Sequence, residues 1–274
     1  MSNSNHTPIK AQHAEPQLNC QAKQLHLTAL SGMPLVEVGD DLPTLLAEVL
    51  ANNQLALQDG DILVIAQKII SKSENRYVLL DEVTPGAEAL EWADKVDKDP
   101  RLVQLILDES TEVVRHRPGV MIVAHRCGYV HANAGIDRSN ITSLDNRERV
   151  LLLPIDSNAS AKKISDVFAA QGLNIGVVIS DSAGRAWRNG ITGFAIGSAG
   201  VPALRSAIGS TDLFGRALEV TEIADADELA SAASLLMGQG NESVPVVLIR
   251  GWQWNRGEQD ASSLIRDAEA DLFR

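Results

Sequence analysis

Short apolar runs of strand length recur along the chain and are separated by longer segments with a helical pattern. The apolar runs are DILVIA at 61–66, VMIVA at 120–124, VLLLP at 150–154, GVVIS at 176–180 and PVVLIR at 245–250. Apolar runs of this length, bounded by polar residues, proline or glycine, are typical of strands buried in a sheet. We therefore predict a buried strand at each of these places.

Helical patterns occupy much of the sequence between these strands. They cover residues 40–50, 99–110, 157–172 and 225–238. Asp99 followed by Pro100 is a typical helix start, and Gly172 and Gly238 are typical helix ends. Strands and helices are interleaved, but their spacing is irregular and long glycine-rich stretches interrupt it. This pattern predicts an α+β fold of mixed α/β character, without the even rhythm of a doubly wound sheet.

The two ends of the chain differ from its centre. Residues 1–24 are polar, rich in Asn, Gln and His, and have no apolar period, so we expect a mobile leader. Residues 255–274 are charged but contain ASSLIRDAEADLF, which fits one short amphipathic helix in a C-terminal tail. No repeat, low-complexity linker or change of composition divides the chain between these ends, so we treat residues 25–254 as one domain.

Composition narrows the class of function. The chain has 274 residues, 45% of them hydrophobic, and a formal net charge of −12. An acidic chain lacks the clustered Lys and Arg of a nucleic-acid surface, so an anionic ligand requires a local basic pocket. The apolar runs fall far short of the roughly 20 residues that span a bilayer, no secretory signal is visible, and Cys20 and Cys127 form no disulfide or zinc pattern. We expect a cytoplasmic protein that binds neither nucleic acid nor membrane.

The first candidate site follows the apolar run at 176–180. Asp181 and Ser182 stand where the chain leaves the core, and Arg185, Arg188 and Asn189 follow among glycines. Oxygen ligands of this kind suit a hard cation such as Mg²⁺ or Mn²⁺, and arginines suit phosphate or carboxylate oxygens. By residue type alone, an equally good alternative is that Asp181 caps a turn and the arginines pair with surface acids.

A second group of polar residues lies in HRCGYVHANAGIDRSNI at 125–141. It brings His125, His131, Asp137 and Asn140 together with glycines, a density that a plain turn does not require. Asp137 would be a second anionic metal ligand and would form, with Asp181, a pair of carboxylates that holds a divalent ion against nucleotide phosphates. Each histidine taken singly is more simply explained by local hydrogen bonds.

Three other segments carry weaker signals. Gln67, Lys68 and Lys72 follow the run at 61–66 and can reach a triphosphate, although lysines on a solvated face are the simpler explanation. The segment MGQGNESVPVV at 237–247 and the turn SGMP at 31–34 suit a close approach to a ligand or the end of a helix or strand. The chain has neither a G-x-x-x-x-G-K-[ST] motif nor G-x-G-x-x-G after a strand, so we expect neither a P-loop nor a Rossmann fold.

Taken together, several segments resemble the coenzyme F420:L-glutamate ligase family, also called F420-0:γ-glutamyl ligase. They are SGMP, GDILVIAQKIISK, KDPRLVQLILDES, HRCGYVHANAGIDRSN, ISDSAGRAWRNGITGFAIGSAG, DLFGRAL and ADELASAASLLMGQG with VPVVLIRG. The similarity runs from about residue 26 to about residue 252 and is most specific in ANAGIDRSN and SDSAGRAWRNG. The resemblance implies a two-lobed F420 ligase-like fold, with residues 25–254 as the catalytic domain.

The resemblance also implies a reaction. Ligases of this family use GTP to add L-glutamate by γ-linkage to the deazaflavin precursor F420-0, giving F420-1 and longer forms with release of GDP and phosphate. They need two divalent ions, Mg²⁺ or Mn²⁺, with K⁺ as a helper, and form an intertwined homodimer. An acyl phosphate is the simplest intermediate for such a ligation. Two other classes fit the same carboxylates, namely a metal-dependent GTP phosphohydrolase and a non-catalytic nucleotide-binding dimer.

Site residues carry over by matching motif. Asp137 and Asp181 would hold one divalent ion, and Ser182, where family members often have Thr, would hold the second with Gln239. The residues implied for the guanine nucleotide are Ser31, Gly32, Met33, Pro34, Gln67, Lys68, Lys72, Asn140, Met237, Gly238, Gln239, Gly240, Asn241, Glu242, Ser243 and Val244. Beside the catalytic Asp137 and Asp181, we assign Arg185 and Arg188 to the anionic substrate by our own inference.

Overall fold

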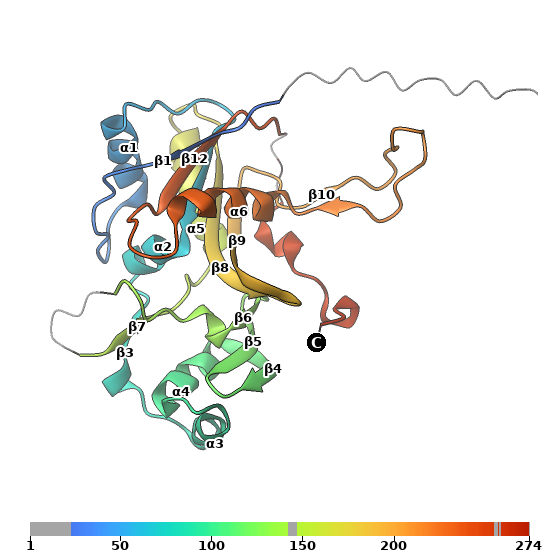
Figure 1. Cartoon of the computed structure of the whole chain (residues 1–274). Coiled ribbons are helices and arrows are strands. Elements are labelled where there is room, and N and C mark those ends of the chain that lie inside the picture. The colour runs from blue at the N-terminus through green and yellow to red at the C-terminus, as the bar shows by residue number, and fades with distance from the viewer. Residues whose placement is uncertain (1–22, 142–146, 255–256, 258, 274) are drawn as a thin grey trace, which may run out of the picture.

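A five-stranded sheet forms the centre of the larger part of the molecule (Figure 1). The computed structural model describes residues 23–141, 147–254, 257 and 259–273. In sheet order, the strands are β1 (His26–Ala29), β12 (Val246–Arg250), β2 (Ile62–Ala66), β8 (Gly176–Arg185) and β9 (Arg188–Ala199). Strands β2 and β8 run parallel, and the other neighbours in this sheet are antiparallel. The fold is α+β, as predicted, and differs from the parallel sheet of a Rossmann fold.

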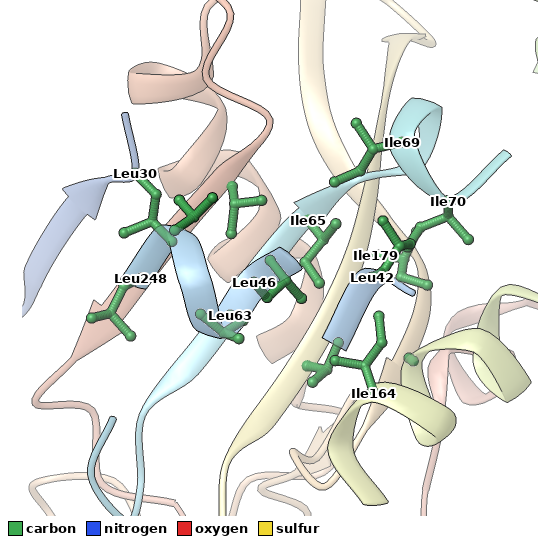
Figure 2. Close-up of a cluster of buried hydrophobic side chains, with 14 of the residues drawn as sticks. Leu30, Leu42, Leu46, Leu63, Ile65, Ile69, Ile70, Ile164, Ile179 and Leu248 are labelled. Carbon is green, nitrogen blue, oxygen red and sulfur yellow. The ribbon is translucent and has the colours of Figure 1, made fainter. Parts of the chain in front are cut away.

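Two apolar layers cover the faces of this sheet. The helices that pack on it are α1 (Leu42–Asn52), α5 (Ser157–Ala169) and α6 (Asp225–Met237). Leu63 and Ile65 of β2 belong to the layer with α1 and α5 (Figure 2). Their neighbours Ile62 and Val64 belong to the layer with α6. Because successive side chains of a strand point to opposite faces, a strand covered on both faces is apolar at every position.

A second, smaller lobe has an apolar core of its own, below the large sheet in Figure 1. Its elements are β3 (Tyr77–Leu79), α3 (Ala87–Val96), α4 (Pro100–Asp108), β4 (Ser110–Arg117), β5 (Val120–His125), β6 (Val130–Ala132) and β7 (Arg149–Leu151). Strands β4, β5 and β6 form one sheet, and β3 pairs with β7. Short 3-10 helices lie at Leu80–Glu82 and Asn133–Gly135. The molecule therefore has the two lobes that the resemblance implies.

Two further elements bear on function. Helix α2 (Gln67–Ser73) begins directly after β2 and carries the lysines that the sequence places at the exit of that strand. Strands β10 (Arg205–Ser206) and β11 (Glu222–Ile223) form the base of an arm that projects away from both lobes (Figure 1). Among the described residues, no helix is long and apolar enough to cross a bilayer.

The predicted helix ends and strands largely agree with the structure. Asp99 caps α4, and its side chain accepts a hydrogen bond from the backbone N–H of Arg101 at 2.9 Å. Gly238, at φ 70°, ends α6. The run VLLLP forms a strand only as far as Leu151, and the backbone N–H of Leu152 donates to the carbonyl of Arg76 at 3.0 Å, just before β3 begins. The run GVVIS is the first half of the longer strand β8.

The predicted terminal segments are described only in part. Residues 1–22 of the expected leader lie outside the described residues, so its mobility stays a prediction. The described tail forms two 3-10 helices, Ala261–Leu264 and Ala268–Ala270, where the pattern suggests one amphipathic helix. Ile265 interrupts the helix because it is extended and packs against Gly128 of the small lobe. The division of the chain at residues 25 and 254 likewise stays a prediction.

Candidate functional site

A cavity of about 570 Å³ opens at the edge of the large sheet where β2 ends. Ala66, the last residue of β2, pairs with Ser180 of β8, so the residues that follow both positions emerge side by side. The lining residues are Met33, Pro34, Leu35, Val36, Ala66, Gln67, Lys68, Ile69, Lys72, Asp137, Ser139, Asn140, Ile141, Ser180, Asp181, Ser182, Ser234, Met237, Gly238, Gln239, Gly240, Asn241, Glu242, Ser243, Val244 and Pro245. Most of the residues predicted for the site therefore share one cavity.

Asp137 is held in the cavity by both its backbone and its side chain. Its N–H and C=O exchange hydrogen bonds with Leu151 at 2.9 and 3.0 Å. The Gln67 Nε2 group donates to Asp137 Oδ2 at 2.7 Å, and the Lys68 ammonium forms an ion pair with the same oxygen. Burial raises the pKa of Asp137, and the charge of Asp181 raises it further, against the lowering by Lys68. Asp137 and Asp181 thus belong to the lining of the same cavity.

Asp181 faces the cavity from β8, and Ser182 follows it on the same strand. The Nε2 atom of His131, a buried residue of β6, lies 3.2 Å from Asp181 Oδ2. Burial lowers the pKa of His131, but the hydrogen bond and charge of Asp181 outweigh this effect, and the net pKa is raised. The ring of Phe194 packs on His131 with the ring centroids 5.4 Å apart. His131 therefore fixes the position of Asp181 from behind the cavity wall.

Lys72 and Asn140 connect α2 to the loop that follows α6. The Lys72 ammonium donates to the backbone carbonyl of Asn140 at 2.9 Å. The Asn140 Nδ2 group in turn donates to the carbonyl of Gly240 at 3.1 Å. Burial and the nearby charge of Lys68 lower the pKa of Lys72, whereas Asp137 opposes this shift. Two lysines thus stand close together in a chain that is acidic overall.

The segment from Met237 to Val244 lines the cavity at every position. It leaves the end of α6 through Gly238 and contains Gln239, one of the predicted metal ligands. Within it the backbone N–H of Gly240 donates to the Glu242 carboxylate at 2.8 Å. The predicted nucleotide segment and the predicted metal ligands therefore border the same space.

Four predicted site residues lie outside the cavity lining. Ser31 donates from Oγ to Asn53 Oδ1 at 2.9 Å, at the end of α1, and Gly32 precedes the lining residue Met33. Arg185 and Arg188 are exposed at the turn between β8 and β9, where Arg185 Nη2 lies 3.4 Å from the carbonyl of Asn189. The assignment of these four residues to nucleotide or substrate stays a prediction.

The segment at 125–141 divides between the cavity and the supporting structure. His125 and Arg126 lie against Glu109, at 3.5 and 3.1 Å, outside the cavity lining. Asn133 Oδ1 accepts a hydrogen bond from the backbone of Met121 at 3.1 Å, which holds the 3-10 turn to β5. Several lining residues were not predicted, although two of them, Ser139 and Ile141, adjoin Asn140 and could have been found from the same motif.

The chemistry of the lining fits a hard divalent cation. Among the described residues, no three His, Cys, Asp or Glu side chains are grouped as a metal cluster would require. The predicted ligands are instead oxygen donors, two carboxylates, a hydroxyl and an amide, and all four residues border the cavity. Asp137 and Asp181 both border this cavity, and a positive ion between two carboxylates would favour their charged forms.

Comparison with known proteins supports one family. The family model described as F420-0:gamma-glutamyl ligase matches residues 32–251. The chain is 44% identical over 253 residues to a protein named Coenzyme F420:L-glutamate ligase from Methanothermobacter thermautotrophicus, covering 91% of this chain and 99% of that relative. Proteins of the same name from Methanocaldococcus jannaschii and Archaeoglobus fulgidus are 42% and 39% identical, each over 94% of their own length and over 88% and 89% of this chain. The resemblance found in the sequence is confirmed, and the chain belongs to the F420-0:gamma-glutamyl ligase family.

Proposed function

We propose that this protein is a GTP-dependent acid–amino-acid ligase that joins L-glutamate by γ-linkage to F420-0, giving F420-1 and longer forms. The proposal is carried by the family match over residues 32–251, together with the relatives named Coenzyme F420:L-glutamate ligase. The cavity supports it, because a site for polyanions that react with one another needs cationic side chains and ligands for counter-ions in one place. Lys68, Lys72, Asp137 and Asp181 provide both.

Ligation requires that the acceptor carboxylate be activated. Joining a carboxylate to an amine in water is uphill, because a carboxylate oxygen is a poor leaving group. Transfer of the γ-phosphoryl group of GTP to the carboxylate of F420-0 gives GDP and an acyl phosphate. The α-amine of L-glutamate then attacks the acyl carbon, the amide C–N bond forms, the amine loses a proton and phosphate leaves. The protein has little covalent work in this scheme and acts through positioning and charge.

The nucleotide would lie along α2 and the segment from Met237 to Val244. Lys68 and Lys72 project from α2 into the cavity and would neutralise phosphate oxygens. Met33 and Pro34 line the same cavity and would contact the guanine base or ribose. Asn140 already bridges α2 and the segment after α6 through Lys72 and Gly240, so it would hold the two sides of the nucleotide site together.

The metal ligands would be the four oxygen-bearing residues of the lining. Asp137 and Asp181 would hold one divalent ion, Mg²⁺ or Mn²⁺, and Ser182 with Gln239 the second, with K⁺ as a further cation. When bound, these ions supply positive charge against the β- and γ-phosphate oxygens. His131 would keep the Asp181 carboxylate in place from behind.

The anionic acceptor would extend from the cavity along the β8–β9 hairpin. This direction brings it toward Arg185 and Arg188, which the hairpin presents to solvent next to Asp181 along the chain. Arginine binds carboxylate and phosphodiester oxygens well at such a partly solvated position. Replacing Arg188 by Gln would weaken F420-0 binding and leave nucleotide binding unchanged; an unaltered affinity for F420-0 would remove Arg188 from the site.

An intertwined homodimer forms part of the same proposal. The projecting arm at the end of β10 carries Leu213, Phe214 and Val220, whose side chains are 67%, 87% and 86% exposed. Large apolar side chains gathered on an extended arm suit burial against a second copy of the chain. Sedimentation of the purified protein tests this assembly. A cytoplasmic location would suit an enzyme that uses GTP.

One assay tests the reaction. The purified protein is incubated with GTP, Mn²⁺, L-glutamate and F420-0, and the products are weighed by mass spectrometry. The expected result is F420-1 in equal amount to GDP and phosphate, with little GTP turnover when F420-0 is left out. Full GTP turnover without F420-0 would indicate a phosphohydrolase, and binding of GTP without any turnover would indicate a non-catalytic nucleotide-binding protein.

A further inference from the structure

Trp187 stands at the tip of the hairpin between β8 and β9, and its side chain is 84% exposed. Arg185 and Arg188, which pair across the hairpin, lie on either side of it along the chain. The tip therefore presents a large aromatic ring between two positive charges, in a chain whose formal net charge is −12. Aromatic rings next to cationic side chains suit ligands that carry both a flat ring system and negative charge.

The backbone of the turn does not favour tryptophan at this position. Trp187 has φ +60°, in the left-handed region that glycine adopts readily. For a bulky side chain this conformation is uncommon and unfavourable, and residues held in it are concentrated at ligand sites. The geometry of the turn therefore does not explain the tryptophan, whereas a ligand that stacks on its ring would.

Part of the Trp187 ring already packs against a second aromatic ring. The centroid of the Phe273 ring lies 5.6 Å from that of Trp187, with 55° between the ring planes. Figure 1 shows the C-terminal segment close to the end of this hairpin. A tilted contact at this distance is typical of aromatic pairs. Trp187 is still largely exposed despite this contact, so the indole has room for a further ring.

The distance from the cavity to this tip fits the proposed acceptor. Asp181 lines the cavity, and β8 runs from it to Arg185 over four residue steps, which at about 3.4 Å each is roughly 14 Å. In F420-0 a ribityl chain, a phosphodiester and a short acid separate the deazaflavin ring from the reacting carboxylate by about ten bonds, which is roughly 12 Å when extended. A carboxylate held in the cavity would therefore place the ring beside Trp187.

We propose that the deazaflavin ring of F420-0 stacks on Trp187, while its anionic chain follows β8 into the cavity. The identity of this ligand rests on the function proposed above. Trp187 then recognises the acceptor by its ring and takes no part in the chemistry, which lies at the other end of the acceptor. Its loss should therefore raise KM for F420-0 and leave kcat unchanged.

Two substitutions at this position test the inference. Trp187→Gly removes the ring and suits the left-handed backbone, whereas Trp187→Phe keeps an aromatic ring. Trp187→Gly should weaken F420-0 binding about 5- to 50-fold, as expected for the loss of one stacked ring, and Trp187→Phe should weaken it less than about threefold. Titration followed by deazaflavin fluorescence gives these affinities. Leu90→Ala, which truncates another exposed apolar side chain, in α3 of the small lobe, is the matched control and should bind F420-0 within about twofold of the original protein.

Two fragments of F420-0 show which part of the ligand meets Trp187. One is the ring with its ribityl chain but without the phosphodiester, and the other is the phosphorylated acid without the ring. Trp187→Gly should weaken binding of the ring fragment and leave binding of the ring-less fragment unchanged. Any other pattern would overturn the inference, and so would a lower kcat at an unchanged KM for F420-0.

Folding and assembly are checked on the same variants. In Trp187→Gly the relieved backbone strain offsets the lost contact with Phe273, so Tm should stay within about 3 °C of the original value. A larger fall in Tm together with weaker binding would make Trp187 a structural residue. A change in sedimentation would place it between two copies of the chain. Either result would overturn the inference.

The original protein separates this inference from the proposed function. If it forms no F420-1 but binds the ring fragment through Trp187, the proposed function is wrong and the ring site stands. If the Trp187→Gly variant forms F420-1 with an unchanged KM for F420-0, the proposed function stands and the ring site is wrong.

Discussion

The Asp137→Asn substitution removes one negative charge from the cavity and keeps the size and shape of the side chain. In the structure Asp137 accepts a hydrogen bond from Gln67 Nε2 at 2.7 Å and pairs with Lys68. The Gln67 amide is oriented by Ser71, whose Oγ donates to Gln67 Oε1 at 2.9 Å. An asparagine Oδ1 at position 137 can still accept from Gln67, so the local hydrogen bonds survive the change.

The expected loss of stability is small and the expected loss of activity is large. The Asp137 and Lys68 side chains are 27% and 22% exposed, and an ion pair in contact with solvent contributes about 1 kcal/mol. Burial already disfavours the charged form of Asp137, as its raised pKa indicates, so part of that contribution is cancelled. For a chain of this size about 1 kcal/mol shifts Tm by roughly 2–4 °C. Removing one preorganised charge from a site for polyanions should lower kcat about 100- to 1000-fold.

Three measurements on Asp137→Asn test this reasoning. Product mass spectrometry gives the rate of ligation, calorimetry gives the affinity for Mn²⁺, and a thermal melt gives Tm. Glu148→Gln is the matched control, because Glu148 pairs with Arg138 beside Asp137 but lies outside the cavity lining. The control should change none of the three quantities. A variant that ligates at the original rate and binds Mn²⁺ equally well would refute the role of Asp137, and so would a loss of activity that merely follows unfolding.

Three further predictions concern stability. Asp61→Ala should lower the free energy of unfolding by about 3–5 kcal/mol, because Asp61 is 1% exposed and Arg250 donates to its two oxygens at 2.8 and 2.7 Å; urea unfolding measures this, and a loss below about 1 kcal/mol would contradict it. Gly197→Ala should lower the free energy of unfolding by about 1–3 kcal/mol in the same assay, because a Cβ at this position would lie 2.5 Å from the carbonyl carbon of Ser157 in α5. An unchanged unfolding midpoint would contradict this and would mean that α5 can shift to make room. Burial raises the pKa of Glu109, but the hydrogen bond from His125 and two neighbouring arginines outweigh it, so the pKa is lowered. Its folded pKa lies below the unfolded value near 4.5, so the stability that its charge contributes is present above pH 4.5 and is lost as pH falls through the folded pKa. The difference in Tm between the original protein and Glu109→Gln should therefore shrink below that pH, and a constant difference would contradict this.

Local chemistry explains which elements could be predicted. The start of α4 could be predicted from two residues, because Asp99 caps the helix and the ring of Pro100 fixes φ. Both effects act within one turn of the helix. Strand β9 is different, because its sequence RNGITGFAIGSA contains glycines that lower strand propensity. The structure supplies the reason for two of them. A Cβ on Gly193 would lie 2.9 Å from the carbonyl carbon of Ala230 in α6, and a Cβ on Gly197 would clash with α5. The two glycines therefore leave room for helices that are distant in the sequence.

In the candidate site too, some residues could be predicted from their neighbours in the sequence, whereas others are positioned by elements that are distant in the sequence. Asp181 was predicted to stand where the chain leaves the core, but β8 continues through it to Arg185, and Asp181 pairs with Phe194 of β9 while it lines the cavity. Its contact with His131 joins β6 of one lobe to β8 of the other, and no spacing in the sequence indicates it. Ser31 was grouped with Met33 by proximity in the sequence, yet its side chain turns to Asn53 at the end of α1. The side-chain direction of a turn residue depends on which distant element packs beside it.

The cavity lining contains two acids, Asp137 and Asp181, and two lysines, Lys68 and Lys72. Elsewhere in the described part of the chain, two buried acids are each paired with one arginine. Asp61 pairs with Arg250 and Asp225 with Arg205, so these acids are satisfied within the protein. In the cavity the charge of Asp181 raises the pKa of Asp137, which burial also raises, and the charge of Lys68 adds to burial in lowering the pKa of Lys72. Crowding of this kind is unfavourable in the free protein, and the proposed binding of cations to the acids and of phosphates to the lysines would offset it. An acidic chain could therefore bind a polyanion, because the phosphates would neutralise the lysines while the cations neutralise the acids. Saturating nucleotide together with Mn²⁺ should then raise Tm more than nucleotide or Mn²⁺ alone.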